Sequence, residues 1–470
     1  MQLPYRGSGK VNFNGKEYQC DLYYSEKLGG IVIKINTVDE NTIGSFLQLP
    51  LEISCLSGQL GSGFKFTLLN LIRTRMENLI SYGRSVYTFH AKYLLSGVEL
   101  GNQETPTFHK VQYTLSNIIE WGNESAYAIG KKFEITHTAD DIKKQLYSEQ
   151  GLTITYIVRT SATPLVDHEV LKEKITLEQC GILEISSTSE ESLSHFDSSF
   201  MQLKRLIEIA SFKKVNVEKM QAYSSNILYT IGENTIERAV DVYGKDILEY
   251  TAEEIPPSHP WKWIGLQELI DHNSFSLYFD KHKKLAPIIE LFLEPFHTEN
   301  SSRTRVFLSL LQALETYHSR FITNDLDEFK LRIEDIVKDT FDSNAEKCRT
   351  FLLANSRKFI TLESRIADLL LARWKIRFDT GEINYMDFPS VIAHTRHYYT
   401  HYDEGIKDKY RVLSEEDLQF YNRSLLQILE YYVLLELGFP QDNKESQRRL
   451  SERWGNVSQD LEILKISRSQ

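Results

Sequence analysis

The sequence predicts an α+β multidomain protein in which a β-rich, sandwich-like N-terminal domain is followed by an all-α helical bundle. Short strand-like segments separated by glycine-containing turns fill roughly the first 185 residues, and apolar residues at helical spacing dominate from about residue 300. The chain of 470 residues is long enough for two or three domains. We expect a β-rich domain, a connector, a helical bundle and a polar tail, at residues 1–250, 251–299, 300–445 and 446–470.

The composition is that of an ordinary globular protein, with 41% hydrophobic and 25% charged residues. The formal net charge of −11 argues against a protein that coats nucleic acid without specificity, but it allows a nuclease with a local basic patch. The four cysteines lie far apart without a Cys-x-x-Cys pair, which fits a reducing cytosol. The first ten residues lack the apolar run of a signal peptide, so we expect a cytoplasmic protein.

The N-terminal half begins with a predicted hairpin, because Val11–Phe13 and Lys16–Tyr24 flank the turn dipeptide Asn14-Gly15. Many short strands with glycine turns favour a sandwich or a distorted barrel. The further strand candidates are Ile31–Ile35, Phe64–Asn70, Ser85–Leu95, Phe133–Thr136, Leu152–Val158 and Lys174–Ile185.

Two glycine-rich stretches invite a nucleotide-binding interpretation, and neither supports it. In Gly7-Ser8-Gly9-Lys10 the lysine is followed by Val11, where a P-loop requires Ser or Thr, and the next element is a predicted strand. We expect a glycine turn before the first strand. A strand also follows Gly58–Gly63, which we expect to be a hairpin turn.

Helical periodicity begins in the middle of the chain. A helix is predicted over residues 193–210, with a start signal at Ser187–Glu190. The proline-rich segment Ile255–Pro260 resembles a connector, and Trp261 and Trp263 after it are expected to be packing anchors. Three apolar stripes then predict bundle helices, the last of which ends at Gly438 and Pro440. These stripes are Phe307, Leu310, Leu311, Leu314 and His318; Phe359, Leu362, Ile366, Leu369 and Leu370; and Leu425, Ile428, Leu429, Tyr432 and Leu435.

The segment Ala393–Asp403 holds three histidines and an arginine, which is the densest group of these residues in the chain. Four residues separate Arg396 from His401, and no other histidine has an arginine five positions before it. An arginine holds phosphate through its fork of donors, and a histidine moves a proton near neutral pH. Together they supply what phosphodiester cleavage needs without a metal.

A basic stretch precedes this motif. Between Lys347 and Arg377 there are eight basic residues, and only Glu363 and Asp368 oppose them. The stretch is either a solvated helix face or a track for the RNA backbone. On the second interpretation Arg373, Lys375, Arg377 and, within the motif, Tyr399 are candidate RNA-binding residues.

The C-terminal part resembles the HEPN superfamily, whose hallmark is Arg-x4–6-His, and the two-part layout is similar to ApeA-like defence proteins. Leu115–Trp121 and Gly63–Asn70 are similar to segments of the ApeA-like N-terminal domain, and His397 stands where those proteins more often have Asn. The resemblance implies a metal-independent, homodimeric or higher oligomeric endoribonuclease without a cofactor. It also implies a role in antiphage abortive infection, with RNA as the substrate, tRNA being one candidate, and a phage protein as the trigger for a sensor-like N-terminal domain.

The spacing of the motif has a geometric consequence. Residues five apart on a regular helix point about 140° away from each other, so either the helix ends or distorts, or a second subunit completes the site.

In the expected RNA cleavage His401 transfers the proton, Arg396 stabilises the charge and His397 orients His401 or contacts phosphate. Glu315 and Arg320 upstream are either supporting residues or a surface ion pair.

Three alternatives remain open from the sequence. His394, His397 and His401 lie on one helical stripe near Asp403 and could bind Zn²⁺ in a metal-dependent hydrolase. The bundle could also be a non-catalytic RNA- or protein-binding module. Finally, the histidines could simply pack in an aromatic-rich helix.

Overall fold

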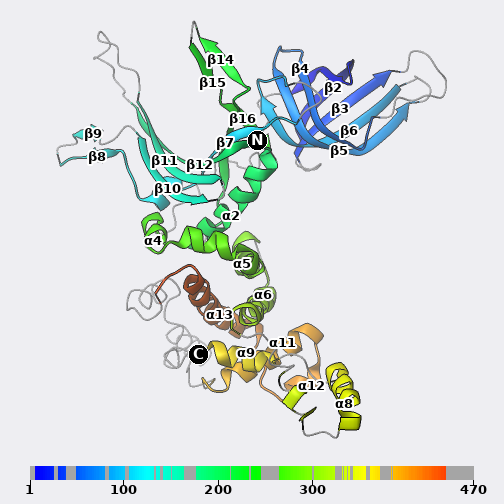
Figure 1. The fold of residues 1–470 in the computed structure, drawn as a ribbon, viewed down its shortest axis with the longest axis vertical. Coiled ribbons are helices and arrows are strands. Elements are labelled where there is room, and N and C mark those ends of the chain that lie inside the picture. The colour runs from blue at the N-terminus through cyan, green and yellow to red at the C-terminus, as the bar shows by residue number, and fades with distance from the viewer. Residues whose placement is uncertain are drawn as a thin grey trace, which may run out of the picture. The chain divides into compact units, whose positions relative to one another are not determined.

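The structure is a computed structural model, and it divides the chain into two compact units (Figure 1). One unit comprises residues 1–204 and 215–260, and the other comprises residues 205–214 and 261–470. The structure describes residues 6–25, 30–38, 49–79, 84–100, 105–131, 134–137, 141–149, 151–162, 176–211, 213–231, 234–244, 264–298, 301–322, 331, 333–335, 337–338, 342–355, 360–370, 383 and 385–440.

The N-terminal unit is built on one twelve-stranded antiparallel sheet in the order β10-β11-β12-β7-β13-β16-β6-β3-β2-β1-β4-β5. Its strands are β1 (Gly7–Phe13), β2 (Lys16–Ser25), β3 (Gly30–Val38), β4 (Glu52–Leu60), β5 (Lys65–Leu79), β6 (Arg84–Ser96), β7 (Phe108–Leu115), β10 (Asp141–Glu149), β11 (Leu152–Ala162), β12 (Leu177–Glu191), β13 (Val217–Tyr223) and β16 (Val240–Gly244). Two small two-stranded sheets accompany it, one of β8 (Tyr127–Ile129) and β9 (Ile135–His137), the other of β14 (Leu228–Ile231) and β15 (Asn234–Glu237).

Strand β6 closes part of this sheet into a barrel. One edge of β6 pairs with β5 along nearly its whole length, while the other edge pairs first with β3 over residues 84–91 and then with β16 over residues 93–95. The sheet therefore branches at β6: β1 to β6 close on themselves, and the remaining strands continue as an open sheet. The β-rich prediction is confirmed, and of the two architectures left open the distorted barrel replaces the sandwich-like one, because the strands form one branching sheet.

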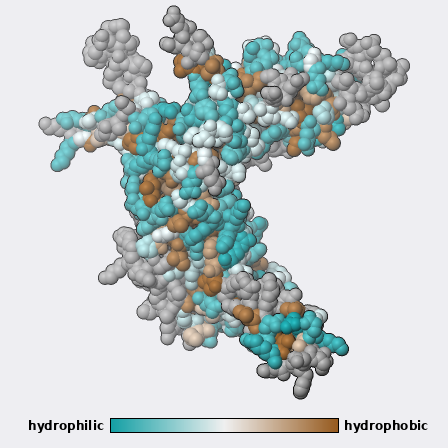
Figure 2. Space-filling view, viewed as in Figure 1, coloured by the Kyte–Doolittle hydropathy of each residue, from teal (hydrophilic) through white to brown (hydrophobic). Residues whose placement is uncertain are grey.

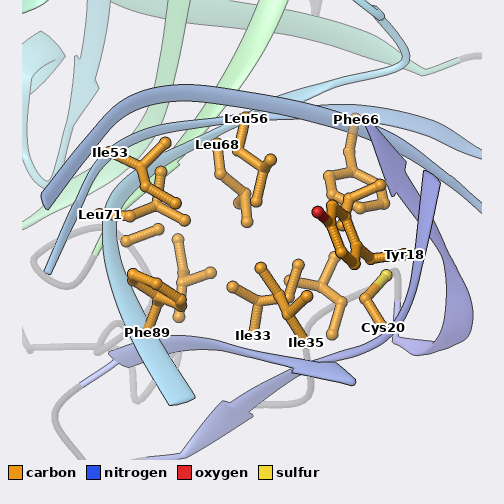
Figure 3. Close-up of a cluster of buried hydrophobic side chains, with 14 of the residues drawn as sticks. Tyr18, Cys20, Ile33, Ile35, Ile53, Leu56, Phe66, Leu68, Leu71 and Phe89 are labelled. Carbon is orange, nitrogen blue, oxygen red and sulfur yellow. The ribbon is translucent and has the colours of Figure 1, made fainter. Parts of the chain in front are cut away.

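Apolar side chains fill the barrel. Tyr18 and Cys20 from β2, Ile33 and Ile35 from β3, and Phe66 from β5 are buried and point toward one another, together with further residues from β4, β5 and β6 (Figure 3). A barrel of this kind is stabilised by its filled interior, since burying each large apolar side chain contributes about 1.5–3 kcal/mol.

The glycines of the first strand allow close approach between strands and do not form the expected turn. Gly9 lies inside β1, where a Cβ atom would collide with the backbone of Gln59 on β4, and one at Gly58 would collide with the backbone of Lys10. The hairpin after β1 is confirmed. Asn14 and Gly15 have φ values of 51° and 75°, as a turn with two left-handed central residues requires.

The open sheet is accompanied by α1 (Ile118–Gly122), with buried Trp121, and by α2 (Leu193–Ser211). The predicted start signal for α2 at Ser187–Glu190 is wrong, because these residues extend β12 to Glu191. Glu190 accepts hydrogen bonds from Thr107 and Ser225, which hold it in the sheet region and not at a helix cap.

The C-terminal unit is helical. It contains α4 (Leu266–Asp271), α5 (Ser274–His297), α6 (Arg303–Tyr317), the π-helical turn η4 (His318–Ile322), α8 (Asp342–Asn355), α9 (Leu362–Leu369), α11 (Phe388–His401), α12 (Glu404–Lys407) and α13 (Glu415–Glu436). Helices α5, α6 and α13 pack against one another, and α11 packs against α9 and α6. Most residues of the predicted apolar stripes are buried, but Leu362 and Leu370 are half-buried and Leu435 is exposed. Phe359 lies outside the described residues.

The expected connector at residues 251–299 is wrong where the structure describes it. Residues 266–297 form α4 and α5, and α5 is tied to α13 because Ser274 Oγ donates to the Leu437 carbonyl and Lys281 pairs with Glu436 at 2.8 Å. Trp261, Trp263 and the tail 446–470 lie outside the described residues. Two prolines within α5 mislead a sequence-based assignment, because prolines usually interrupt helices.

The last helix ends as predicted. Gly438 has φ 89°, and the N–H groups of Gly438 and Phe439 bond back to the carbonyls of Leu435 and Leu434, the pattern of a Schellman cap.

Figure 2 shows hydrophilic residues over most of the face in view, with hydrophobic residues in small groups. Among the helices that the structure describes, none is both long and apolar enough to cross a bilayer.

Candidate functional site

Helix α11 presents the motif because its apolar residues recur at helical spacing. Phe388, Val391, Ile392, Thr395, Tyr398 and Tyr399 form the buried face. That face leaves Arg396 at its edge, half-buried, and leaves His397 and His401 exposed. The helix runs without interruption through His401, so Arg396 and His401 point about 140° apart around its axis.

Arg396 is held by an acidic residue on α6. Its Nη2 lies 2.8 Å from Glu315 Oε2, and its Nη1 donates to Glu315 Oε1 at 3.3 Å. This bidentate pair fixes the plane of the guanidinium, and a guanidinium has five N–H donors. Donors therefore remain for a phosphate. The interpretation of Glu315 as a partner of the motif is supported by this geometry.

Arg320, the other upstream candidate, has a structural role. It donates from Nη1 to the carbonyls of Lys283 and Lys284 on α5, at 3.1 Å and 2.8 Å. Pro287 has no N–H to bond to the Lys283 carbonyl, so Arg320 satisfies a group that the proline leaves open.

The two exposed histidines lie together. The ring centroids of His397 and His401 are 4.8 Å apart, as expected for side chains one helical turn apart. His401 is the last residue of α11, because Tyr402 adopts a left-handed conformation with φ 52°. Within one chain, the structure therefore brings His397 and His401 together and turns Arg396 toward α6.

Two residues of the buried face secure the loop before α13, and no sequence pattern indicated this role. Thr395 is fully buried; its hydroxyl donates to the Val391 carbonyl at 2.7 Å and accepts from the Leu413 N–H at 3.0 Å. The Tyr399 hydroxyl donates to the Leu413 carbonyl at 3.1 Å. Both backbone groups of Leu413 are thus satisfied by α11.

The same geometry removes Tyr399 from the RNA-binding candidates. Tyr399 is only 8% exposed and its hydroxyl is engaged with Leu413, so it cannot stack on a base in this arrangement. Burial also raises the pKa of the Tyr399 hydroxyl, which keeps it neutral.

The basic stretch is only partly described. Arg373, Lys375 and Arg377 lie outside the described residues. Arg349 is paired with Glu334 and Glu346, and Arg365 is buried, donating to His318 Nδ1 at 3.2 Å. Both arginines are therefore engaged with neighbouring side chains of the same chain.

The metal alternative finds no support in the described part of the chain. His394 stacks on Tyr410 with ring centroids 3.9 Å apart, whereas His397 and His401 lie beside each other. Among the described residues there is no group of three His, Cys, Asp or Glu side chains that could hold a metal ion.

Two known protein families match this chain, one in each half. The family described as Apea-like HEPN matches residues 308–443, which include Glu315, Arg396 and His401. The family described as ApeA N-terminal domain 1 matches residues 5–231, which include the barrel. Searches of curated proteins and of solved structures found no match. The two family matches together cover most of the chain, which is therefore an ApeA-like protein with a C-terminal HEPN domain.

Proposed function

We propose that this chain is a metal-independent endoribonuclease of the HEPN type that acts in antiphage abortive infection in the bacterial cytoplasm. The observation that carries the proposal is the arrangement on α11. An exposed pair of histidines, His397 and His401, follows an arginine that Glu315 holds in a fixed plane, within the residues that match the HEPN family. The substrate is RNA, with tRNA as one candidate.

The chemistry follows from the groups present. One histidine takes the proton of the ribose 2′-hydroxyl, the 2′-oxygen forms a bond to phosphorus, and the bond from phosphorus to the 5′-oxygen breaks. A second histidine protonates the departing 5′-oxygen. The products are a 2′,3′-cyclic phosphate and a 5′-hydroxyl. Arg396 stabilises the negative charge that develops on the phosphoryl oxygens. Because the nucleophile is part of the substrate, the first step needs no activated water.

Assembly of the site requires two chains. Arg396 and His401 lie about 140° apart on one unbroken helix, so one copy of the motif cannot direct both groups at one phosphate. A two-fold dimer that brings two α11 helices together supplies an arginine from one chain and a histidine from the other. We therefore propose a homodimer as the smallest active form.

An RNA-cleavage assay with EDTA present tests the activity and the mechanism together. We expect the wild-type protein to cleave, Arg396→Lys to fail because an ammonium lacks the guanidinium fork, and the product ends to be 2′,3′-cyclic phosphates. Products ending in 3′-hydroxyl, or activity that appears only with Mg²⁺ or Zn²⁺, would overturn the mechanism.

The N-terminal unit is proposed to restrain the nuclease until a phage protein binds it. This unit is a separate compact unit and matches the ApeA N-terminal domain. A fragment comprising residues 261–470 tests the restraint, and it retains α5, which packs against α6 and α13. We expect the fragment to cleave RNA without phage. If it folds, dimerises and stays inactive while the full chain cleaves, the restraint is refuted.

A further inference from the structure

The N-terminal unit contains a cavity of about 880 Å³ at the point where the barrel joins the open sheet. Strands β4, β5 and β6 line one side, and α2, β7, β13 and β16 line the rest. Small-molecule pockets usually enclose about 300–1,000 Å³, so the volume is that of a ligand site. Asn70, which lines the cavity, has a left-handed backbone with φ 54° and is not paired with a residue of β4 or β6.

Three of the residues that line this cavity carry a buried polar atom without a partner among the described residues. His90 Nε2, the Tyr93 hydroxyl and the Tyr113 hydroxyl are buried, and none of them forms a hydrogen bond with the described part of the chain. All three residues line the cavity. Tyr93 and Tyr113 are only 4% and 1% exposed. A buried polar group without a partner costs about 1–3 kcal/mol, so the Tyr93 and Tyr113 hydroxyls favour a partner that the described residues do not supply.

The wall is mainly apolar. The ring of Tyr113 stacks on Phe200 of α2 with centroids 3.8 Å apart and an interplanar angle of 3°. Met220 and Val217 contribute buried apolar surface beside it. Tyr93 and Tyr113 stand on paired strands of the sheet, β6 and β7, and side chains that are ordered before binding lower its entropy cost.

The groups inside are uncharged. Burial lowers the pKa of His90 and raises that of Tyr113, so the imidazole and the phenol are both neutral near pH 7. The charged residues that line the cavity, Glu52, Lys92, Asp197 and Lys204, are exposed or half-buried, and Lys92 lies 3.3 Å from Asp197. A ligand that carries a net charge would find no buried counter-charge.

We propose that this cavity is a binding site for an uncharged, largely apolar small molecule whose polar atoms accept hydrogen bonds from Tyr93 and Tyr113. The apolar body of the ligand covers Phe200 and Met220. Ile72 and Met201, which are 57% and 39% exposed, provide apolar surface at the more open part of the cavity. The site is distinct from α11 and belongs to the other unit, so it does not depend on the proposed RNA cleavage.

The test is a fluorescence titration of the full-length chain with Nile red, an uncharged heterocycle with a carbonyl acceptor. We expect saturable binding of one dye per chain. Ser198→Trp should weaken binding at least tenfold, because Ser198 is an exposed residue of α2 that lines the cavity, and the indole would fill it. Ser62→Trp is the matched control; Ser62 is exposed in the turn between β4 and β5 and does not line the cavity. It should bind as the wild type does.

The hydroxyls are tested by Tyr93→Phe and Tyr113→Phe. Each variant should weaken dye binding by about threefold to tenfold, the value of one hydrogen bond, while the Tm of the dye-free protein stays the same or rises. A Tm that falls would show that the hydroxyl has a partner within the protein. Absence of saturable binding to the wild type, equal binding by Ser198→Trp, or full affinity in both Phe variants would each overturn the proposal.

Discussion

Arg396 on α11 and Glu315 on α6 form a bidentate ion pair, with Nη2 2.8 Å from Oε2 and Nη1 3.3 Å from Oε1. The side chains are 37% and 26% exposed, so solvent screens the pair and its contribution to stability is about 0–1 kcal/mol. Its value lies in the direction that it imposes on the guanidinium. Ion pairs that orient a functional arginine are expected to affect the rate of reaction more than the stability of the fold.

The first prediction concerns this orientation. Glu315→Ala should lower RNA cleavage by up to about 100-fold, because the guanidinium loses its fixed plane, and it should change the unfolding free energy by no more than about 1 kcal/mol. Glu315→Gln keeps one acceptor and should retain more activity. Single-turnover rates measure the effect. Faster cleavage by Glu315→Ala than by the wild type would mean that Glu315 shields the arginine from RNA.

The second prediction separates the three histidines of α11. His401→Ala should reduce cleavage and phage protection by about 10²–10⁴-fold, the usual contribution of a general acid or base. His397→Asn, which introduces the residue more common in ApeA-like proteins, should be milder. His394→Ala is the control, since His394 stacks on Tyr410 and not on His401.

Stability decides how these results are interpreted. His401 is exposed, so its replacement should change the unfolding free energy by no more than about 0.5 kcal/mol. A urea titration measures this. If His394→Ala abolishes cleavage while remaining folded, or His401→Ala remains active, the assignment of His401 is wrong.

The third prediction concerns the composite site. Arg396→Ala and His401→Ala chains should each be inactive as homodimers, and mixing them should restore cleavage. In the mixed dimer, one of the two sites combines the intact Arg396 of one chain with the intact His401 of the other. Exchange of subunits is confirmed by native mass. If mixed dimers form and remain inactive, both groups act within one chain, and a fully active monomer in light scattering would contradict the two-fold site altogether.

The fourth prediction concerns the support of α11. Thr395→Val removes a hydroxyl that accepts the Leu413 N–H at 3.0 Å inside the core, leaving that N–H unsatisfied. We expect a loss of about 1–3 kcal/mol in unfolding free energy and faster amide exchange at Leu413. Thr395→Ser keeps the hydroxyl and should protect the amide. Equal exchange rates in the two variants would show that Thr395 does not hold this loop.

Local features of the fold were determined by the sequence alone. Asn14-Gly15 predicts a tight hairpin because both residues adopt positive φ with little strain, and the structure has φ 51° and 75° there. Gly438 predicts the end of α13 for the same reason. Apolar spacing predicts α6, α9 and α13, and the Arg-x4-His pattern on α11 identified the candidate site. Each of these properties depends on residues only a few positions apart in the chain.

Tertiary structure decided the properties that depend on distant residues. The barrel exists because β6 pairs with β5, β3 and β16, and no local pattern specifies which strands share an edge. Helix α5 tolerates Pro287 because Arg320 supplies the missing donor. Glu315 meets Arg396 across 81 residues of chain, and Thr395 meets Leu413 across 18. Such contacts arise from packing of whole helices, so their partners become apparent only when the helices are placed together in space.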